Sequence, residues 1–167
     1  MHFTSVVRFI SIIALCTSLA AHAAELMGRV VGVHDGDTIT ILDLSKQQHK
    51  IRLAGIDAPE GKQPFGARSR QNLVSMVHTR TVTVNWQKRD HYGRIVGQVY
   101  AEGSDVGIEQ VRSGFAWWYR AYAREQSAKD RKAFAAAEQD ARAAKRGLWV
   151  DPHAVAPWDW RRLKKAR

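Results

Sequence analysis

Asp35-Gly36-Asp37-Thr38 joins two stretches of the chain that favour β-strands. Valines dominate the segment before it, residues 26–34, and threonine alternates with isoleucine in the segment 37–43. Because Asp-Gly is a frequent hairpin turn between such segments, we expect the two to pair as antiparallel strands. A third strand over residues 48–55 would complete a three-stranded meander.

The segment after the third strand brings acidic residues back toward the first turn. With a tight turn between the second and third strands, residue numbers of paired positions would add to about 91, so that Asp37 would lie opposite Ala54. Asp57 and Glu60 would then reach the same end of the barrel. Carboxylates gathered in this way, with Arg52 on one strand, suit an oxygen-ligated cation and a phosphate group.

The rest of the pattern predicts two further strands and three helices. Helical spacing of apolar residues, alternation of valine with polar residues, and glycines at the helix ends are the signals used. The predicted elements are a helix over residues 64–77, strands over 80–86 and 94–101, and helices over 105–113 and 125–145. Five strands in all are the number found in a small closed barrel.

The first 23 residues have the features of a secretory signal peptide. A basic residue, Arg8, precedes an apolar run over residues 9–21, and Ala21-His22-Ala23 is a small-residue cleavage site. We therefore expect cleavage near Ala23 and a location in the periplasm or the medium, with membrane contact only through an uncleaved signal.

The 167-residue length suits one folded domain, which we place at residues 24–150. Residues 151–167 form a basic tail with two tryptophans, expected to wrap the body and to fray from residue 161 onward. The lone cysteine, Cys16, lies in the signal, so the mature chain is predicted to fold without disulfides.

The formal net charge of +10 favours a polyanionic partner. Nucleic acid would be attracted by such a field, and the interaction would weaken with salt. Anionic lipid or a cell-wall polymer would respond to the same field, so charge alone does not choose among them.

Three motifs in this order and spacing resemble the staphylococcal nuclease (thermonuclease) family. They are residues 35–38, residues 52–60, and Asp90-His91-Tyr92-Gly93-Arg94. The resemblance covers nearly all of the chain after the signal. It implies an α+β fold, namely a five-stranded OB-fold barrel with three α-helices. It also implies a secreted, monomeric, calcium-dependent endonuclease that hydrolyses DNA and RNA with little sequence preference, leaves 3′-phosphates, and has no stable protein partner.

The resemblance also assigns the metal site. Asp37 and Asp57 would bind calcium directly, the backbone carbonyl of Ala58 would be a third ligand, and Glu60 would reach the ion through water. The best-known members of the family have threonine where this chain has Ala58. Since the backbone oxygen is the expected ligand, the replacement should weaken calcium affinity without removing the site.

Three side chains are the candidate catalytic groups. Attack on a phosphodiester adds negative charge to its oxygens, and the planar forks of Arg52 and Arg94 can each meet two of them, which lysine cannot reproduce. Glu60 is the candidate to orient or deprotonate the attacking water.

Three more residues are candidates for binding substrate. By the resemblance Tyr122 lines a nucleotide pocket, and Arg120 stands at the position of a companion tyrosine. His91 lies in the turn before Arg94 and could touch phosphate. Exposed aromatic rings stack on unpaired bases, so single-stranded or locally unpaired nucleic acid is the favoured substrate.

Two other functions remain open on the sequence. One is a catalytically inactive OB-fold protein that only binds nucleic acid or a protein ligand, and the other is an envelope-associated cationic protein. The first has no need of the full catalytic set, which is present here. The second explains the charge and the signal but not the carboxylates.

Overall fold

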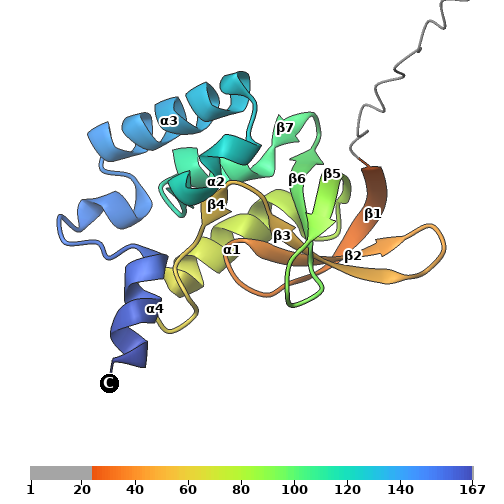
Figure 1. Ribbon diagram of the computed structural model, residues 1–167, viewed down its shortest axis with the longest axis horizontal. Helices are drawn as coiled ribbons and strands as arrows, with labels where there is room; N and C mark the ends of the chain where they lie inside the picture. Colours follow the sequence, from red (N-terminus) through yellow and green to blue (C-terminus); the bar gives the residue numbers. More distant parts are fainter. Residues whose placement is uncertain (1–23, 167) are drawn as a thin grey trace, which may run out of the picture.

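The computed structural model describes residues 24–166, so the predicted signal peptide lies outside the described residues. Five strands close into a barrel (Figure 1). They are β1 (Ala24–Val33), β2 (Thr38–Asp43), β3 (Gln48–Leu53), β5 (Thr81–Arg89) and β6 (Ile95–Ala101). Neighbours in the order β3-β2-β1-β5-β6 are antiparallel, and β3 closes the barrel by pairing with β6 in parallel. The predicted α+β fold with a five-stranded OB-type barrel is confirmed.

Helices and short strands surround this barrel. The α-helices are α1 (Gly66–Val77), α2 (Val106–Arg112), α3 (Ala128–Ala143) and α4 (Pro157–Lys165). The short strands are β4 (Ile56–Asp57), β7 (Ser104–Asp105) and β8 (Trp117–Trp118), and the 3₁₀ segments are η1 (Arg120–Glu125) and η2 (Gly147–Val150). Across the part of the chain that the structure describes, no helix is both long and apolar enough to cross a membrane.

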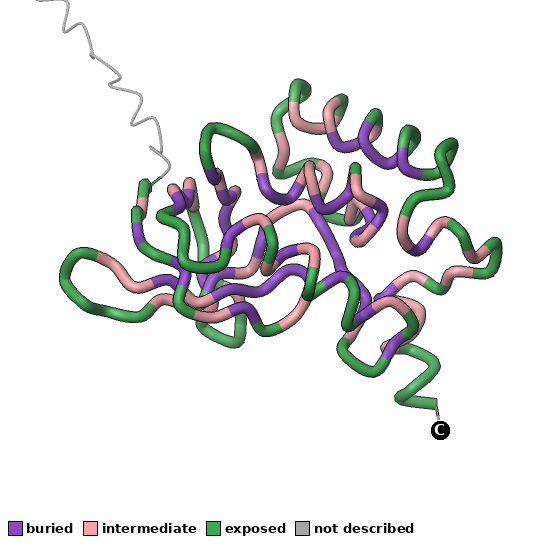
Figure 2. The backbone as a smooth tube through the Cα atoms, turned by 180° about the vertical axis from the view of Figure 1, so that it is seen from behind, coloured by how far each residue is buried: buried purple, intermediate pink, exposed green. Residues whose placement is uncertain are grey.

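Alternate positions on the strands fill the barrel interior. Ile39 and Ile41 on β2 face inward with Ile51 on β3, and all three are fully buried. Phe134 on α3 packs into the same core. Figure 2 shows the result, with buried stretches along the barrel strands and exposed residues concentrated in the turns and at the end of α4.

The three helices predicted within residues 24–150 are α1, α2 and α3. The long helix begins at Ala128 rather than near residue 125, because the Ser127 side chain accepts a hydrogen bond from the backbone N–H of Asp130 and caps it there. The Asp105 side chain caps α2 in the same way.

The expected register of the meander is wrong by one residue. Arg52 lies opposite Thr38, and the backbone N–H of Leu53 donates to the carbonyl oxygen of Asp37 at 2.8 Å. The shift comes from the turn between β2 and β3, in which Lys46 adopts a positive φ of 60° and its N–H bonds to the carbonyl of Asp43. Asp37 is thereby placed next to Arg52.

The expectation that the chain frays from residue 161 is also wrong. Residues through Lys165 are helical in α4, with Pro157 in its first turn, where proline is favoured. Contacts with the body of the protein hold this helix, including a hydrogen bond of 2.6 Å from Gln63 Nε2 to the carbonyl of Val155 just before it.

A fully buried amide connects the two helices behind the barrel to the turn that carries Asp37. Gln110 on α2 is 0% exposed, and its Nε2 donates to the carbonyl of Gly36 at 2.8 Å and to that of Ser69 on α1 at 3.0 Å. Its Oε1 accepts from Asn72 Nδ2. These bonds fix the position of the turn between β1 and β2.

Replacing Gln110 with alanine is expected to lower the free energy of unfolding by about 2–4 kcal/mol, since it leaves buried carbonyls without a donor and opens a cavity. Urea denaturation measures the change. Gln139→Ala, at an exposed position of α3, is the control and should stay within about 0.5 kcal/mol of the unaltered protein. Equal losses in the two variants would contradict this account of Gln110.

Candidate active site

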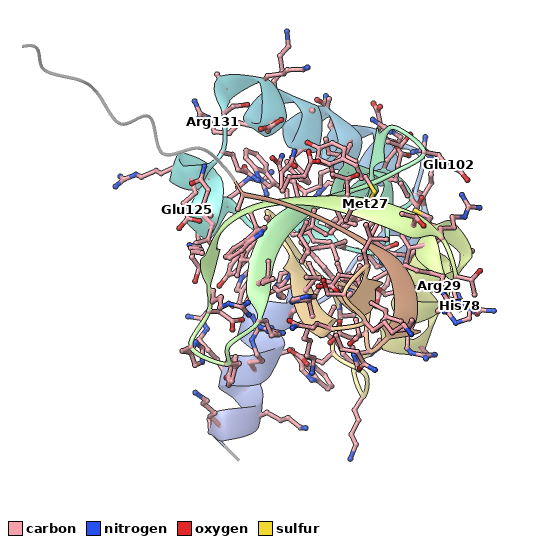
Figure 3. The ribbon with its side chains drawn as sticks, turned by 90° about the vertical axis from the view of Figure 1, so that its right-hand side faces the viewer. Met27, Arg29, His78, Glu102, Glu125 and Arg131 are labelled. Carbon is pink, nitrogen blue, oxygen red and sulfur yellow. The ribbon has the colours of Figure 1, made fainter. Side chains whose placement is uncertain are left out.

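A cavity of about 790 Å³ opens where β3, β4 and the turn between β5 and β6 meet η1 and α4. Most of the residues predicted from the sequence line it. They are Asp37, Arg52, Asp57, Ala58, Glu60, His91, Arg94 and Tyr122. In Figure 3 the labelled Glu125, which also lines the cavity, lies on the opposite side of the barrel from Arg29 and His78.

Two buried carboxylates share one arginine at the base of the cavity. Asp37 and Asp57 are 6% and 2% exposed. Arg52 Nη1 lies 3.2 Å from Asp37 Oδ2, and its Nη2 lies 3.1 Å from Asp57 Oδ1. The backbone N–H of Ala58 also donates to Asp37 Oδ2 at 2.9 Å. Strand pairing, rather than one local motif, therefore assembles the pair.

Negative charge at this base is incompletely compensated. Burial raises the pKa of Asp57, although the hydrogen bond from Arg161 and the charge of Arg52 oppose the shift. Burial and the neighbouring Asp37 carboxylate raise the pKa of Asp35, which also lines the cavity, to about 6. A bound cation would stabilise the ionised form of buried carboxylates whose pKa is raised in this way.

Arg94 lies beside this base, held from two sides. Its Nε donates to Asp90 Oδ2 at 2.7 Å, and its Nη1 donates to Thr38 Oγ1 at 3.3 Å. Asp90 in turn accepts from the backbone N–H groups of Tyr92 and Arg94, which shapes the turn between β5 and β6. The guanidinium is thus positioned at the cavity by Asp90 and Thr38 and makes no ion pair with Asp37 or Asp57.

Glu60 lies at the rim, where its side chain is 44% exposed. Its backbone N–H donates to the Gln63 side chain at 3.1 Å, and its carboxylate accepts from Arg161 Nη1 at 2.8 Å. A carboxylate so placed can reach both solvent and a group bound in the cavity.

Arg161 is a site residue that the sequence reasoning missed. Its Nη2 lies 2.7 Å from Asp57 Oδ2, and its Nη1 lies 3.3 Å from Asp57 Oδ1 and 2.8 Å from Glu60 Oε1. The sequence did contain a signal for this residue. Pro157 can begin a helix, and residues three apart such as Trp158 and Arg161 lie on one face of it.

Aromatic rings form the other end of the cavity. Tyr119 and Tyr122 line it with ring centroids 5.1 Å apart in an edge-on arrangement, and the Lys88 ammonium lies 5.2 Å from the centre of the Tyr122 ring. Trp158 stacks on Tyr119, with centroids 5.2 Å apart and ring planes 5° from parallel. His91 packs against Tyr92 in the exposed turn, with ring centroids 3.7 Å apart.

The structure does not bring Arg120 to these rings. Its guanidinium pairs with Glu138 on α3 at 2.7 Å and lies 4.5 Å from the centre of the Trp118 ring. The backbone N–H of Tyr119 donates to the carbonyl of Gly55, and this bond places Tyr119, not Arg120, beside Tyr122 at the cavity.

The donor set suits a hard divalent cation. Within residues 24–166, no three acidic, histidine or cysteine side chains already lie at the spacing of a complete metal site, and arginines are hydrogen-bonded to the acidic groups instead. The carboxylates of Asp37, Asp57 and Glu60 offer oxygen ligands, which suit hard cations such as calcium and magnesium better than zinc. These carboxylates fit such an ion once the hydrogen bonds that arginines make to them are released.

The sequence of this chain is similar to a known protein family and to several named proteins. Residues 50–151 match the family model described as staphylococcal nuclease homologue. An Escherichia coli protein named as an uncharacterized endonuclease is 42% identical over 158 residues, which cover 94% of this chain and 99% of that protein. A Shigella flexneri protein named micrococcal nuclease is 39% identical over 151 residues, covering 85% of this chain and 84% of that protein.

Proposed function

Because the chain belongs to the staphylococcal nuclease family, we propose that it is a calcium-dependent endonuclease that hydrolyses DNA and RNA with little sequence preference. The observation that carries this proposal is the convergence of two arginines, two buried carboxylates and one exposed carboxylate on one cavity. A protein that only binds nucleic acid needs a basic surface, but has no need of buried carboxylates beside the phosphate-binding arginines.

The carboxylates of Asp37 and Asp57, with the backbone carbonyl of Ala58, would hold the calcium ion. When bound, the ion would act as a Lewis acid that polarises a phosphate oxygen. Thr38 Oγ1 and the Ala58 N–H, which both donate to Asp37, hold that carboxylate in place. Because the expected ligand at position 58 is the backbone carbonyl, alanine there would keep this contribution.

The two guanidinium groups would meet the charge that develops on the phosphate. Arg52 lies on β3 and Arg94 immediately precedes β6, so they reach the cavity from two strands that pair in parallel. Each presents a fork of N–H donors with the geometry of two phosphate oxygens. Glu60, at the rim, would orient the attacking water and accept its proton.

Tyr119 and Tyr122 would receive a nucleobase next to the scissile phosphate. Stacking on aromatic rings is tolerant of base identity, which accounts for low sequence preference and for favouring unpaired strands. The net charge of +10 would attract either nucleic acid, and the N-terminal signal would direct the enzyme to the periplasm or the medium.

Circular single-stranded DNA tests the proposal, because only an endonuclease can cut a circle. Incubation with the protein beginning at Ala24 and millimolar calcium is expected to linearise and then fragment the circle. The fragments should carry 3′-phosphates, so a polymerase would extend them only after phosphatase treatment. Intact circles alongside slow degradation of linear strands from their ends would contradict endonuclease action.

A further inference from the structure

The C-terminal helix α4 places a cation on the carboxylates that are expected to bind calcium. Arg161 makes a two-pronged contact with Asp57 and a third contact with Glu60, at 2.7, 3.3 and 2.8 Å. Both Asp57 oxygens and one Glu60 oxygen therefore already accept hydrogen bonds. A metal ion bound directly by Asp57 would need at least one of these oxygens.

Two contacts hold α4 in this position. Trp158, one helical turn before Arg161, stacks on Tyr119, and the segment before α4 is joined to the loop after β4 by the bond from Gln63 to Val155. Figure 1 shows α4 beside the loop that runs from β4 to α1. Helix α4 thus contacts the aromatic end of the cavity through Trp158 and the acidic end of the cavity through Arg161.

We propose that Arg161 is an internal counter-ion that competes with the divalent cation for Asp57 and Glu60. Cation binding at Asp57 and the docking of Arg161 then oppose each other, and metal binding loosens α4. This inference rests on the proposed function, because it concerns the same cation. It goes further by assigning the C-terminal helix a role in setting the metal affinity and the access to the site.

Charge and geometry both support competition. A guanidinium bound in two-pronged fashion to a 2%-exposed carboxylate is strongly held. A second positive ion on the same oxygens would lie within a few ångströms of it, where like charges repel strongly at low dielectric. Arg52 differs from Arg161 in that it also donates to the Leu53 carbonyl at 2.9 Å, a contact that a cation on the carboxylates would not displace.

Calcium titration by calorimetry tests the competition without measuring catalysis. Arg161→Gln is expected to bind calcium about fivefold more tightly, or better, because no guanidinium must be released. The matched control is Arg162→Gln, which removes the same charge from the next residue. Arg162 is 79% exposed and pairs with Asp159 within the helix, so its removal should leave calcium affinity unchanged.

Hydrogen exchange on the unaltered protein gives a second readout that needs no variant. Calcium is expected to speed amide exchange in the peptide covering α4 while leaving the barrel strands unchanged. Equal or weaker calcium binding by Arg161→Gln, or slower or unchanged exchange in α4, would overturn the inference. Absence of calcium binding in all three proteins would overturn it as well.

Failure of the proposed function has a different signature, namely no calcium-dependent cleavage by any of the three proteins. Cleavage with an unchanged affinity ratio would reject only the role of Arg161. A changed ratio without cleavage would keep that role and reject the nuclease.

Discussion

Replacing Arg94 with alanine is expected to lower the rate of DNA cleavage by about two to three orders of magnitude. The guanidinium is held by Asp90 and Thr38 at the cavity, where it can meet charge that develops on the phosphate. Its removal would withdraw that stabilisation mainly from the transition state, so kcat should fall more than substrate affinity. Arg94→Lys should recover little of the rate, because an ammonium lacks the planar fork.

Single-turnover cleavage at saturating calcium measures the effect. Arg80→Ala is the matched control, since Arg80 pairs with Glu102, which Figure 3 shows on the side of the barrel away from Glu125. The control should cut at nearly the unaltered rate, and circular dichroism should show both variants folded. Equal rates for the two variants would remove Arg94 from the chemistry, and unfolding of Arg94→Ala would show that its role is structural.

Asp57→Asn is expected to abolish measurable calcium-dependent cleavage and to weaken calcium binding by about a hundredfold or more, since it removes a charged ligand from the site. The metal-free variant should nevertheless stay folded at pH 7, because two effects of the substitution oppose each other. Burial raises the pKa of Asp57 above its unfolded value, so the ionised group destabilises the folded state as pH rises through that pKa. Neutral asparagine removes this cost at pH 7 but also removes the charge that pairs with Arg161 and Arg52, while Arg52 keeps its contact with Asp37.

Thermal unfolding in the presence of chelator, with calorimetric calcium titration, checks both parts. Asp140→Asn, at an exposed position of α3, changes the charge equally and should leave calcium binding and cleavage unaltered. Loss of the folded state in metal-free Asp57→Asn would mean that the contacts of Asp57 with Arg52 and Arg161 are required for folding. Undiminished calcium binding would place the ion elsewhere.

Much of the site was predictable because hairpin turns and alternating strands can be recognised in the sequence, and the pairing of adjacent strands follows from them. The Asp-Gly turn and the alternating strands brought Asp37 and Asp57 to one end of the barrel, and both line the cavity with Arg52. The exact register of β2 and β3 was not predictable, because it depends on the left-handed conformation of Lys46. Lysine rarely adopts that conformation, so its presence does not predict such a turn.

Two site residues depend on long-range contacts that sequence patterns do not reveal. Tyr119, rather than the predicted Arg120, lies at the cavity, because the pairing of β4 with β8 fixes the chain leading into η1. Helix α4 is short and strongly basic, so its own propensity does not predict a stable helix. Its contacts through Trp158 and Arg161 order it, and both partners lie far away in the sequence.

Metal-dependent phosphodiester hydrolysis at this cavity can be tested by comparing DNA cleavage in millimolar calcium with cleavage in excess chelator. We expect cutting with calcium, no cutting with chelator, and recovery when calcium is restored. Undiminished cutting in chelator, or salt-sensitive DNA binding without cutting at any calcium concentration, would contradict this expectation.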